Sequence, residues 1–247
     1  MIDFSAQVVK ISLLSERKII MKPFFKISLM CMDFLNIAAQ IEVLNEEFDG
    51  YHMDIMDGHF CKNITLSPDI VKAIGAIAKK PMDIHLMTTT PNDWIDSCAA
   101  AGAQIISPHA ETINSDAFRI INKIKGKGCK AGVTLNPATP LTYCREYLGK
   151  IDYLTIMTVD VGFAGQPFIP EMLDKIREAK KFREMNNLNF KIMIDGSCNK
   201  NTFGKLHLAG ADGYVLGSSG LFSLDPDLRK ACKKAKEIFM EETGVKL

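Results

Sequence analysis

The sequence predicts an α/β protein with the architecture of a (β/α)8 TIM barrel. Short apolar segments alternate with amphipathic segments along the 247 residues, which is the pattern of parallel strands joined by helices. About 250 residues is the usual length of one such barrel. An open doubly wound sheet is the alternative, but it would leave two sheet edges, and neither end of the chain resembles a protected edge strand.

The predicted elements follow one another regularly. Strands are expected at residues 26–30, 50–56, 81–87, 104–109, 129–135, 153–159, 190–195 and 212–216. Asp33 can cap the first helix, and Ser67 before Pro68 is typical of an N-cap followed by the first helical residue. Further helices are expected at residues 68–79, 91–102, 116–125, 141–148, 171–185, 202–209 and 226–240.

A single (β/α)8 barrel domain is expected at residues 22–247. Residues 1–21 mix apolar with charged side chains, and Asp3 and Glu16 interrupt the apolar core that a signal peptide needs. The sequence Met21-Lys22-Pro23 resembles a second chain start. Residues 1–21 are therefore interpreted as an N-terminal extension or the product of an upstream start codon, and an extra helix packed on the barrel is the alternative.

Composition narrows the classes of partner. Hydrophobic residues make up 47% of the chain and charged residues 24%, and the net charge is +1. No basic stripe favours nucleic acid, and no apolar run reaches the roughly 18 residues of a membrane span. The seven cysteines are scattered without a Cys-x-x-Cys pair, which is typical of a reducing cytoplasm. We expect a cytoplasmic protein that binds neither nucleic acid nor membranes.

The strand at residues 50–56 carries the first functional signal. Side chains alternate faces along a strand, so His52, Asp54 and Met56 point to one side. The pair His52 and Asp54 alone would usually be a coincidence. However, His85 lies near the end of the third strand and Asp195 ends the seventh, and such strand ends meet at one rim of a barrel. This mixed nitrogen and oxygen set predicts a site for one divalent ion such as Zn2+, Mn2+, Fe2+ or Co2+.

Glycine-rich loops follow the last three strands at the same rim. They contain Gly162, Phe163, Ala164 and Gly165, then Gly196 and Ser197, and then Gly217, Ser218 and Ser219. Backbone N–H groups in such loops hold anions, and a phosphate site after strands seven and eight recurs in this architecture. Any one loop could be a plain turn, but together they predict a phosphorylated small molecule as ligand.

These motifs resemble the ribulose-phosphate 3-epimerase family. The resemblance runs from about Lys26 to Phe222 and rests on the residues 52–60 with Asn63, 85–87, 162–166, 195–196 and 217–218. It implies a homo-oligomeric enzyme that inverts C3 of a ketose phosphate through a metal-stabilised enediolate.

The resemblance also implies roles for single residues. His52, Asp54, His85 and Asp195 would bind the metal, with Asp54 accepting the proton and Asp195 donating one. Ser28 and His85 would contact the substrate, and the three glycine-rich loops would bind its phosphate. The active-site wall would consist of Met56, Met87 and Met157. One of the two carboxylates is expected to be ionised and the other protonated before the reaction.

Details within the family pattern bear on the substrate. Met32 and Ser197 resemble enzymes that convert D-allulose 6-phosphate to D-fructose 6-phosphate, so this reaction is the first expectation. The conversion of D-ribulose 5-phosphate to D-xylulose 5-phosphate is the alternative. The sequence departs from the family pattern at Ile27, residues 61–62 and Val161. None of these positions is a predicted metal ligand, so the departures bear on substrate binding and not on the chemistry.

A metal-dependent aldolase or decarboxylase on the same barrel is the alternative from another reaction class. A Schiff-base aldolase needs an inward lysine near a strand end, and Lys191 lies too early in its strand. A barrel that only senses sugar phosphates would have lost a ligand, whereas all four are there. For His109 and Glu111, both a role at the barrel rim and a purely structural role remain open. Asp83 is a candidate partner of a metal ligand.

Overall fold

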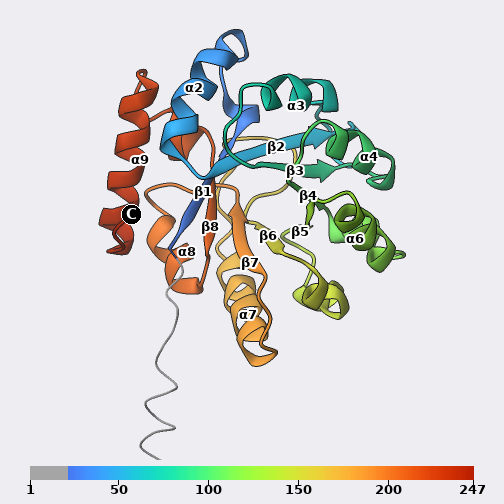
Figure 1. The fold of residues 1–247 in the computed structure, drawn as a ribbon. Helices are drawn as coiled ribbons and strands as arrows, with labels where there is room; N and C mark the ends of the chain where they lie inside the picture. Colours follow the sequence, from blue (N-terminus) through green and yellow to red (C-terminus); the bar gives the residue numbers. More distant parts are fainter. Residues whose placement is uncertain (1–21) are drawn as a thin grey trace, which may run out of the picture.

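The computed structural model describes residues 22–247, and the extension predicted at residues 1–21 lies outside the described residues. Eight parallel strands close into a barrel in chain order, and β1 pairs with both β2 and β8 (Figure 1). The strands are β1 (Phe24–Ser28), β2 (Gly50–Met56), β3 (Met82–Met87), β4 (Ile105–Pro108), β5 (Lys130–Leu135), β6 (Tyr153–Met157), β7 (Lys191–Asp195) and β8 (Gly213–Leu216). The predicted (β/α)8 barrel is confirmed.

Helices surround the barrel on the outside (Figure 1). They are α2 (Ile37–Glu47), α3 (Pro68–Gly75), α4 (Asn92–Ala100), α5 (Ala110–Ile113), α6 (Ala117–Gly126), α7 (Met172–Met185), α8 (Phe203–Ala209) and α9 (Leu228–Thr243). The last helix, α9, contacts both α8 and α2, so the outer ring closes as the barrel does. Within residues 22–247, none of the helices has the length and apolar character needed to cross a membrane.

The two faces of the strands have different chemistry. Outward residues such as Ile27, Ile55 and Ile84 are fully buried against the helices in one apolar cluster. Inward residues of the same strands are largely polar, among them Lys26 and Asp83, and they are buried as well. The hydrophobic core is therefore the layer between strands and helices, and the barrel interior is available for polar side chains.

Some boundaries differ from the prediction. β1 begins and ends two residues earlier than expected. The helix predicted at 141–148 was wrong as an α-helix, because two short 3-10 helices, η3 (Leu141–Tyr143) and η4 (Arg145–Lys150), take its place. Thr142, Tyr143 and Cys144 are weak α-helix formers. Asp33 caps a 3-10 turn, η2 (Phe34–Asn36), through its side chain, and α2 begins only after that turn.

Gly213 provides a test of how tightly the interior is packed. A Cβ atom at this position would lie 2.1 Å from the Phe24 ring on the paired strand β1. We expect Gly213→Ala to destabilise the protein by about 1–3 kcal/mol, because overpacking displaces neighbours in a dense interior. The measurement is urea unfolding, with Gly126→Ala on α6 as control, since nothing lies within 4 Å of a Cβ there. Equal midpoints for the two variants would contradict this packing.

Candidate active site

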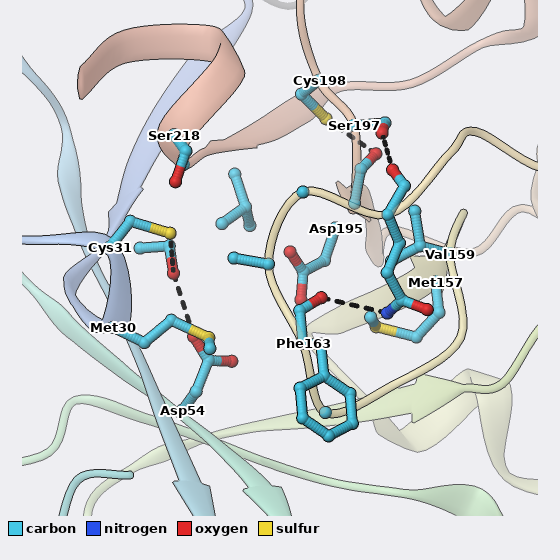
Figure 2. A pocket seen from close by; sticks show the side chains of 18 of the residues that line it. Met30, Cys31, Asp54, Met157, Val159, Phe163, Asp195, Ser197, Cys198 and Ser218 are labelled. Atoms are coloured by element: carbon cyan, nitrogen blue, oxygen red, sulfur yellow. Dashed lines mark hydrogen bonds between the residues drawn. The ribbon is translucent and has the colours of Figure 1, made fainter. Parts of the chain in front are cut away.

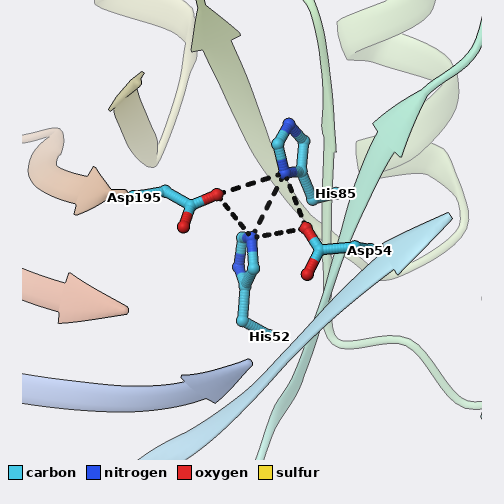
Figure 3. Close-up of side chains that lie close together, drawn as sticks. All are labelled: His52, Asp54, His85 and Asp195. Carbon is cyan, nitrogen blue, oxygen red and sulfur yellow. Dashed lines mark hydrogen bonds and ion pairs between the residues drawn. The ribbon is translucent and has the colours of Figure 1, made fainter. Parts of the chain in front are cut away.

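The register of β2 with β3 brings the predicted ligands together. His52 pairs with Asp83 and Asp54 with His85, so all four side chains share the inward face. Asp195 ends β7 and reaches the same point from across the barrel (Figure 3). His52 and His85 are fully buried, whereas the Asp195 side chain keeps 16% of its surface exposed. The site is thus closed to solvent where the two imidazoles lie, toward the barrel interior, and open to solvent on the side of Asp195.

Four donor atoms converge in the geometry of a cation site. His85 Nδ1 lies 3.1 Å from Asp54 Oδ1 and 3.5 Å from Asp195 Oδ2, and His52 Nε2 lies 3.3 Å and 3.4 Å from the same two oxygens. The two nitrogens are 3.2 Å apart. Tetrahedral ligands bound at about 2.0–2.2 Å would be roughly 3.3–3.6 Å apart. The distances measured here lie close to this range, and all four donor atoms lie within 4.8 Å of one another, so the set can hold one divalent ion with mixed nitrogen and oxygen ligands.

Burial and charge act against each other in this group. Burial lowers the pKa of His52, but the carboxylates of Asp54 and Asp195 outweigh it and raise the pKa well above its ordinary value. Burial likewise raises the pKa of both aspartates, and the charge of His52 with its hydrogen bonds lowers it further than burial raises it. Without a bound cation, the charge of His52 therefore favours the ionised form of both carboxylates, and its positive charge offsets theirs. The expectation that one of the two aspartates is protonated before the reaction stays a prediction.

Polar side chains behind the ligands hold them in place. Asp83 Oδ2 lies 3.4 Å from Nδ1 of His52 and accepts a hydrogen bond of 2.6 Å from Lys26, and the other Asp83 oxygen accepts one from Ser107. Asp83 thus lies behind His52, as a partner of a ligand would. Ser28 donates a 3.0 Å hydrogen bond to Oδ2 of Asp54, which leaves Oδ1 facing the two imidazoles.

A cavity opens above the cluster, at the carboxyl ends of the strands (Figure 2). The predicted residues that line it come from the ends of β1, β2, β3, β6 and β7 and from the three glycine-rich loops: Ser28, Asp54, Met56, Met87, Met157, Gly162, Phe163, Ala164, Gly165, Asp195, Gly196, Ser197, Gly217, Ser218 and Ser219. His52 and His85 do not line it, because they lie beneath. A substrate contact by His85 therefore stays a prediction.

Sequence reasoning missed several residues of this cavity. They are Met30, Cys31, Val159, Asp160, Gln166, Cys198 and Val215. All seven lie within three residues of a predicted site residue, so extending each predicted segment would have found them. Val215 differs from the others in kind, because it is an apolar residue within β8 that carries no sequence signal of its own.

Two hydrogen bonds tie the loops around the cavity to one another. Asn63, after β2, donates a 2.7 Å hydrogen bond to the carbonyl of Gly162, and Ser197, after β7, donates one of 2.6 Å to the carbonyl of Gln166. Ser197 has a φ of 48°, a left-handed conformation that costs energy for a residue with a side chain. The strained backbone aims its hydroxyl at the loop after β6 and fixes both loops.

The cavity also lacks a basic side chain. Among residues 22–247, neither lysine nor arginine lines it, whereas serine hydroxyls and glycine backbones do. An anionic group in this cavity would have to be held by hydroxyl and backbone N–H groups, as in other glycine-rich anion sites. This is consistent with the prediction of a phosphate site at these loops.

Comparisons with known proteins point to one family. The model of the ribulose-phosphate 3 epimerase family matches residues 25–222. The ribulose-phosphate 3-epimerase of Escherichia coli is 37% identical over 207 residues, which cover 82% of this chain and 90% of that protein. The enzyme of the same name from Synechocystis sp. is 39% identical over 194 residues, covering 78% and 84%.

Solved structures resemble this chain in fold. A 3-hexulose-6-phosphate synthase superposes with a TM-score of 0.64 at 13% identity, covering 89% of this chain and 99% of that one. So low an identity shows a shared barrel and lends no support to an aldolase reaction here. The predicted homo-oligomer and cytoplasmic location stay predictions.

The contribution of the buried ion pair between Lys26 and Asp83 to protein stability can be measured by substitution. Lys26 is 3% exposed, and its ammonium lies 2.6 Å from Asp83 and 4.3 Å from the centre of the Tyr153 ring. We expect Lys26→Met to cost about 3–5 kcal/mol in urea unfolding, because it leaves a buried carboxylate without its cation. The control is Lys191→Met. The ammonium of Lys191 lies 5.0 Å from the centre of the Phe24 ring, and losing this contact should cost about 1 kcal/mol or less. Equal losses of unfolding free energy in the two variants would show that Lys26 does not stabilise the buried charge of Asp83.

Proposed function

Because this chain belongs to the ribulose-phosphate 3-epimerase family, we propose that it interconverts ketose phosphates that differ in configuration at C3. The observation that carries the proposal is the convergence of Asp54 and Asp195 with two imidazoles at the floor of one cavity. The names of the curated relatives favour D-ribulose 5-phosphate and D-xylulose 5-phosphate as the substrate pair. D-Allulose 6-phosphate is the second candidate, supported by Ser197 in the cavity wall.

The two aspartates supply the proton transfers. Asp54 removes the proton from C3, the C3–H electron pair forms the C2–C3 double bond, and the C2 carbonyl oxygen takes the negative charge. Asp195 then protonates the opposite face of the flat enediolate at C3, and the carbonyl re-forms with inverted configuration. The two residues come from β2 and β7, on different sides of the cavity (Figure 2). In the reverse reaction their roles exchange.

The two oxygens of Asp54 allow it a double role. Oδ1 faces the imidazole nitrogens and belongs to the donor set, whereas Oδ2 accepts the Ser28 hydrogen bond at the cavity wall. We assign the C3 proton to Oδ2. Since both aspartates have a lowered pKa in the free protein, Asp195 must gain its proton before the sugar turns over in this direction.

His52, Asp54, His85 and Asp195 would hold the divalent cation. When bound, such a cation supplies Lewis-acid stabilisation of the negative charge on the sugar oxygens, worth several kcal/mol. Met56 and Met87 are buried and, with Met157, give the cavity a dry wall that keeps water from the reacting carbon. The three glycine-rich loops would hold the phosphate through backbone and hydroxyl groups.

A comparison of substrates tests the proposed activity. We expect kcat/KM for D-ribulose 5-phosphate to exceed that for D-allulose 6-phosphate by at least about tenfold, since a misplaced phosphate loses roughly 1.4 kcal/mol or more of transition-state binding. The measurement is a coupled assay of both sugars with one protein preparation. The reverse preference would select the second candidate. Turnover of neither sugar by protein supplied with divalent ions would contradict an epimerase function.

The two-base assignment is tested by proton exchange in deuterated water. We expect Asp54→Asn and Asp195→Asn each to lower turnover by at least about 100-fold, because each removes one acid–base group. Each variant should block the exchange step served by the missing group, followed by NMR of the C3 proton. Asp69→Asn on α3 is the control, since this residue is exposed and lies outside the cavity. Wild-type exchange in either active-site variant would remove that residue from the mechanism.

A further inference from the structure

A chain of three side chains leads away from the cation group behind His85. Nε2 of His85 lies 2.8 Å from Nε2 of His109, and Nδ1 of His109 lies 3.2 Å from Oε2 of Glu111. The two ring centroids are 4.9 Å apart and the planes differ by only 26°, so with the nitrogens this close the rings meet edge to edge. Figure 3 shows Nδ1 of His85 directed at the carboxylates and its other nitrogen turned away.

Water cannot supply the hydrogen bonds of either imidazole in this series of side chains. His85 and His109 are fully buried, and the Phe60 ring lies 4.6 Å from the His109 ring. His109 precedes α5 at the end of β4, and Glu111 lies on α5. A buried imidazole must use both nitrogens in hydrogen bonds or ligation, so the proton positions in the chain are coupled.

The hydrogen bonds allow only one consistent arrangement with a cation at His85. Ligation through Nδ1 requires that nitrogen to be bare, so Nε2 of His85 carries the proton and donates it to Nε2 of His109. Nε2 of His109 is then bare, and its Nδ1 carries a proton that it donates to Glu111. With the opposite tautomers, Glu111 would face a lone pair and His85 would point a proton at the cation site.

The charges of the chain agree with this arrangement. Burial raises the pKa of Glu111, but the hydrogen bonds from His109 and Thr139 outweigh it and bring the pKa to about 2. A carboxylate that stays ionised is an acceptor only, and it therefore selects the His109 tautomer that carries a proton on Nδ1.

We propose that Glu111, acting through His109, fixes the tautomer of His85 and directs its Nδ1 lone pair at the cation site. Both are positioning residues, since neither is a member of the donor group. The inference rests on the cation site of the proposed function. Partners of this kind typically change metal affinity by about 10- to 100-fold.

Glu111 has a second contact that the test must separate from the first. Its Oε1 accepts a 3.0 Å hydrogen bond from the backbone N–H of Asn136, in the loop after β5. Glu111→Gln keeps the size of the side chain, and its amide oxygen can keep this bond. The amide NH2 then faces Nδ1 of His109 and donates to it, which reverses every proton in the chain. The matched control is Lys175→Met, because Lys175 donates to the carbonyls of Asn136 and Pro137 and makes no hydrogen bond to the relay of Glu111, His109 and His85.

The experiment measures Zn2+ affinity by competition with a chromophoric chelator, with thermal unfolding of each variant alongside. We expect Glu111→Gln to weaken Zn2+ binding by about 10- to 100-fold at an unchanged melting temperature. His109→Leu, which removes the relay without touching Asn136, should weaken it in the same direction, and Lys175→Met should bind Zn2+ like the wild type. Nitrogen-15 NMR of the Zn2+-loaded wild type should show His85 protonated at Nε2 and His109 protonated at Nδ1.

The outcomes separate the relay from the cation site. Wild-type affinity in both Glu111→Gln and His109→Leu would overturn the relay and leave the epimerase proposal intact. Equal losses in Lys175→Met and Glu111→Gln would show that Glu111 only supports the loop, and would also overturn the relay. Failure of the wild type to bind Zn2+ more tightly than a His52→Ala variant would overturn the cation site itself.

Discussion

Backbone hydrogen bonding between β2 and β3 fixes one register, in which His52 lies beside Asp83 and Asp54 beside His85. A shift by one residue would turn these side chains toward the helices and bring Ile55 or Ile84 into the interior. The apolar layer opposes such a shift, because Ile55 and Ile84 are fully buried against the helices. The hydrophobic core outside the barrel therefore holds the polar group inside it in place.

A polar interior has to satisfy its own charges. His52, Asp83 and His85 are fully buried, and solvent cannot screen them. Asp83 meets this constraint with Lys26 below and His52 above, so it joins the floor of the barrel to the ligand group. Two carboxylates and two imidazoles around one point supply the mixed oxygen and nitrogen donor atoms that a divalent cation can bind. The same arrangement that makes the interior costly to assemble makes it able to bind such an ion.

The sequence allowed the barrel and most of the cavity to be predicted, for reasons that particular residues illustrate. Strand alternation places His52 and Asp54 on one face whatever their neighbours do, and the fold brings Asp195 to the same rim. The contacts of His109 could not be predicted, because they depend on the distance across β3 and β4 and on the position of Glu111 on a four-residue helix. The 3-10 turns after β5 could not be predicted from the spacing of apolar residues, because that spacing does not show that the residues there are weak α-helix formers.

The strands and the loops of this barrel have separate tasks, and this explains why the substrate is harder to assign than the reaction. The donor atoms and both acid–base groups come from β2, β3 and β7, whose register admits little variation. The phosphate of a hexulose lies one carbon further from C3 than that of a pentulose, so substrate length is decided by where the glycine-rich loops lie. Two of those loops are held by hydrogen bonds, one from Asn63 to the carbonyl of Gly162 and one from Ser197 to the carbonyl of Gln166, and neither bond involves a residue of the donor group. Substitution at Ser197 can therefore change which sugar fits without changing how its C3 proton is moved.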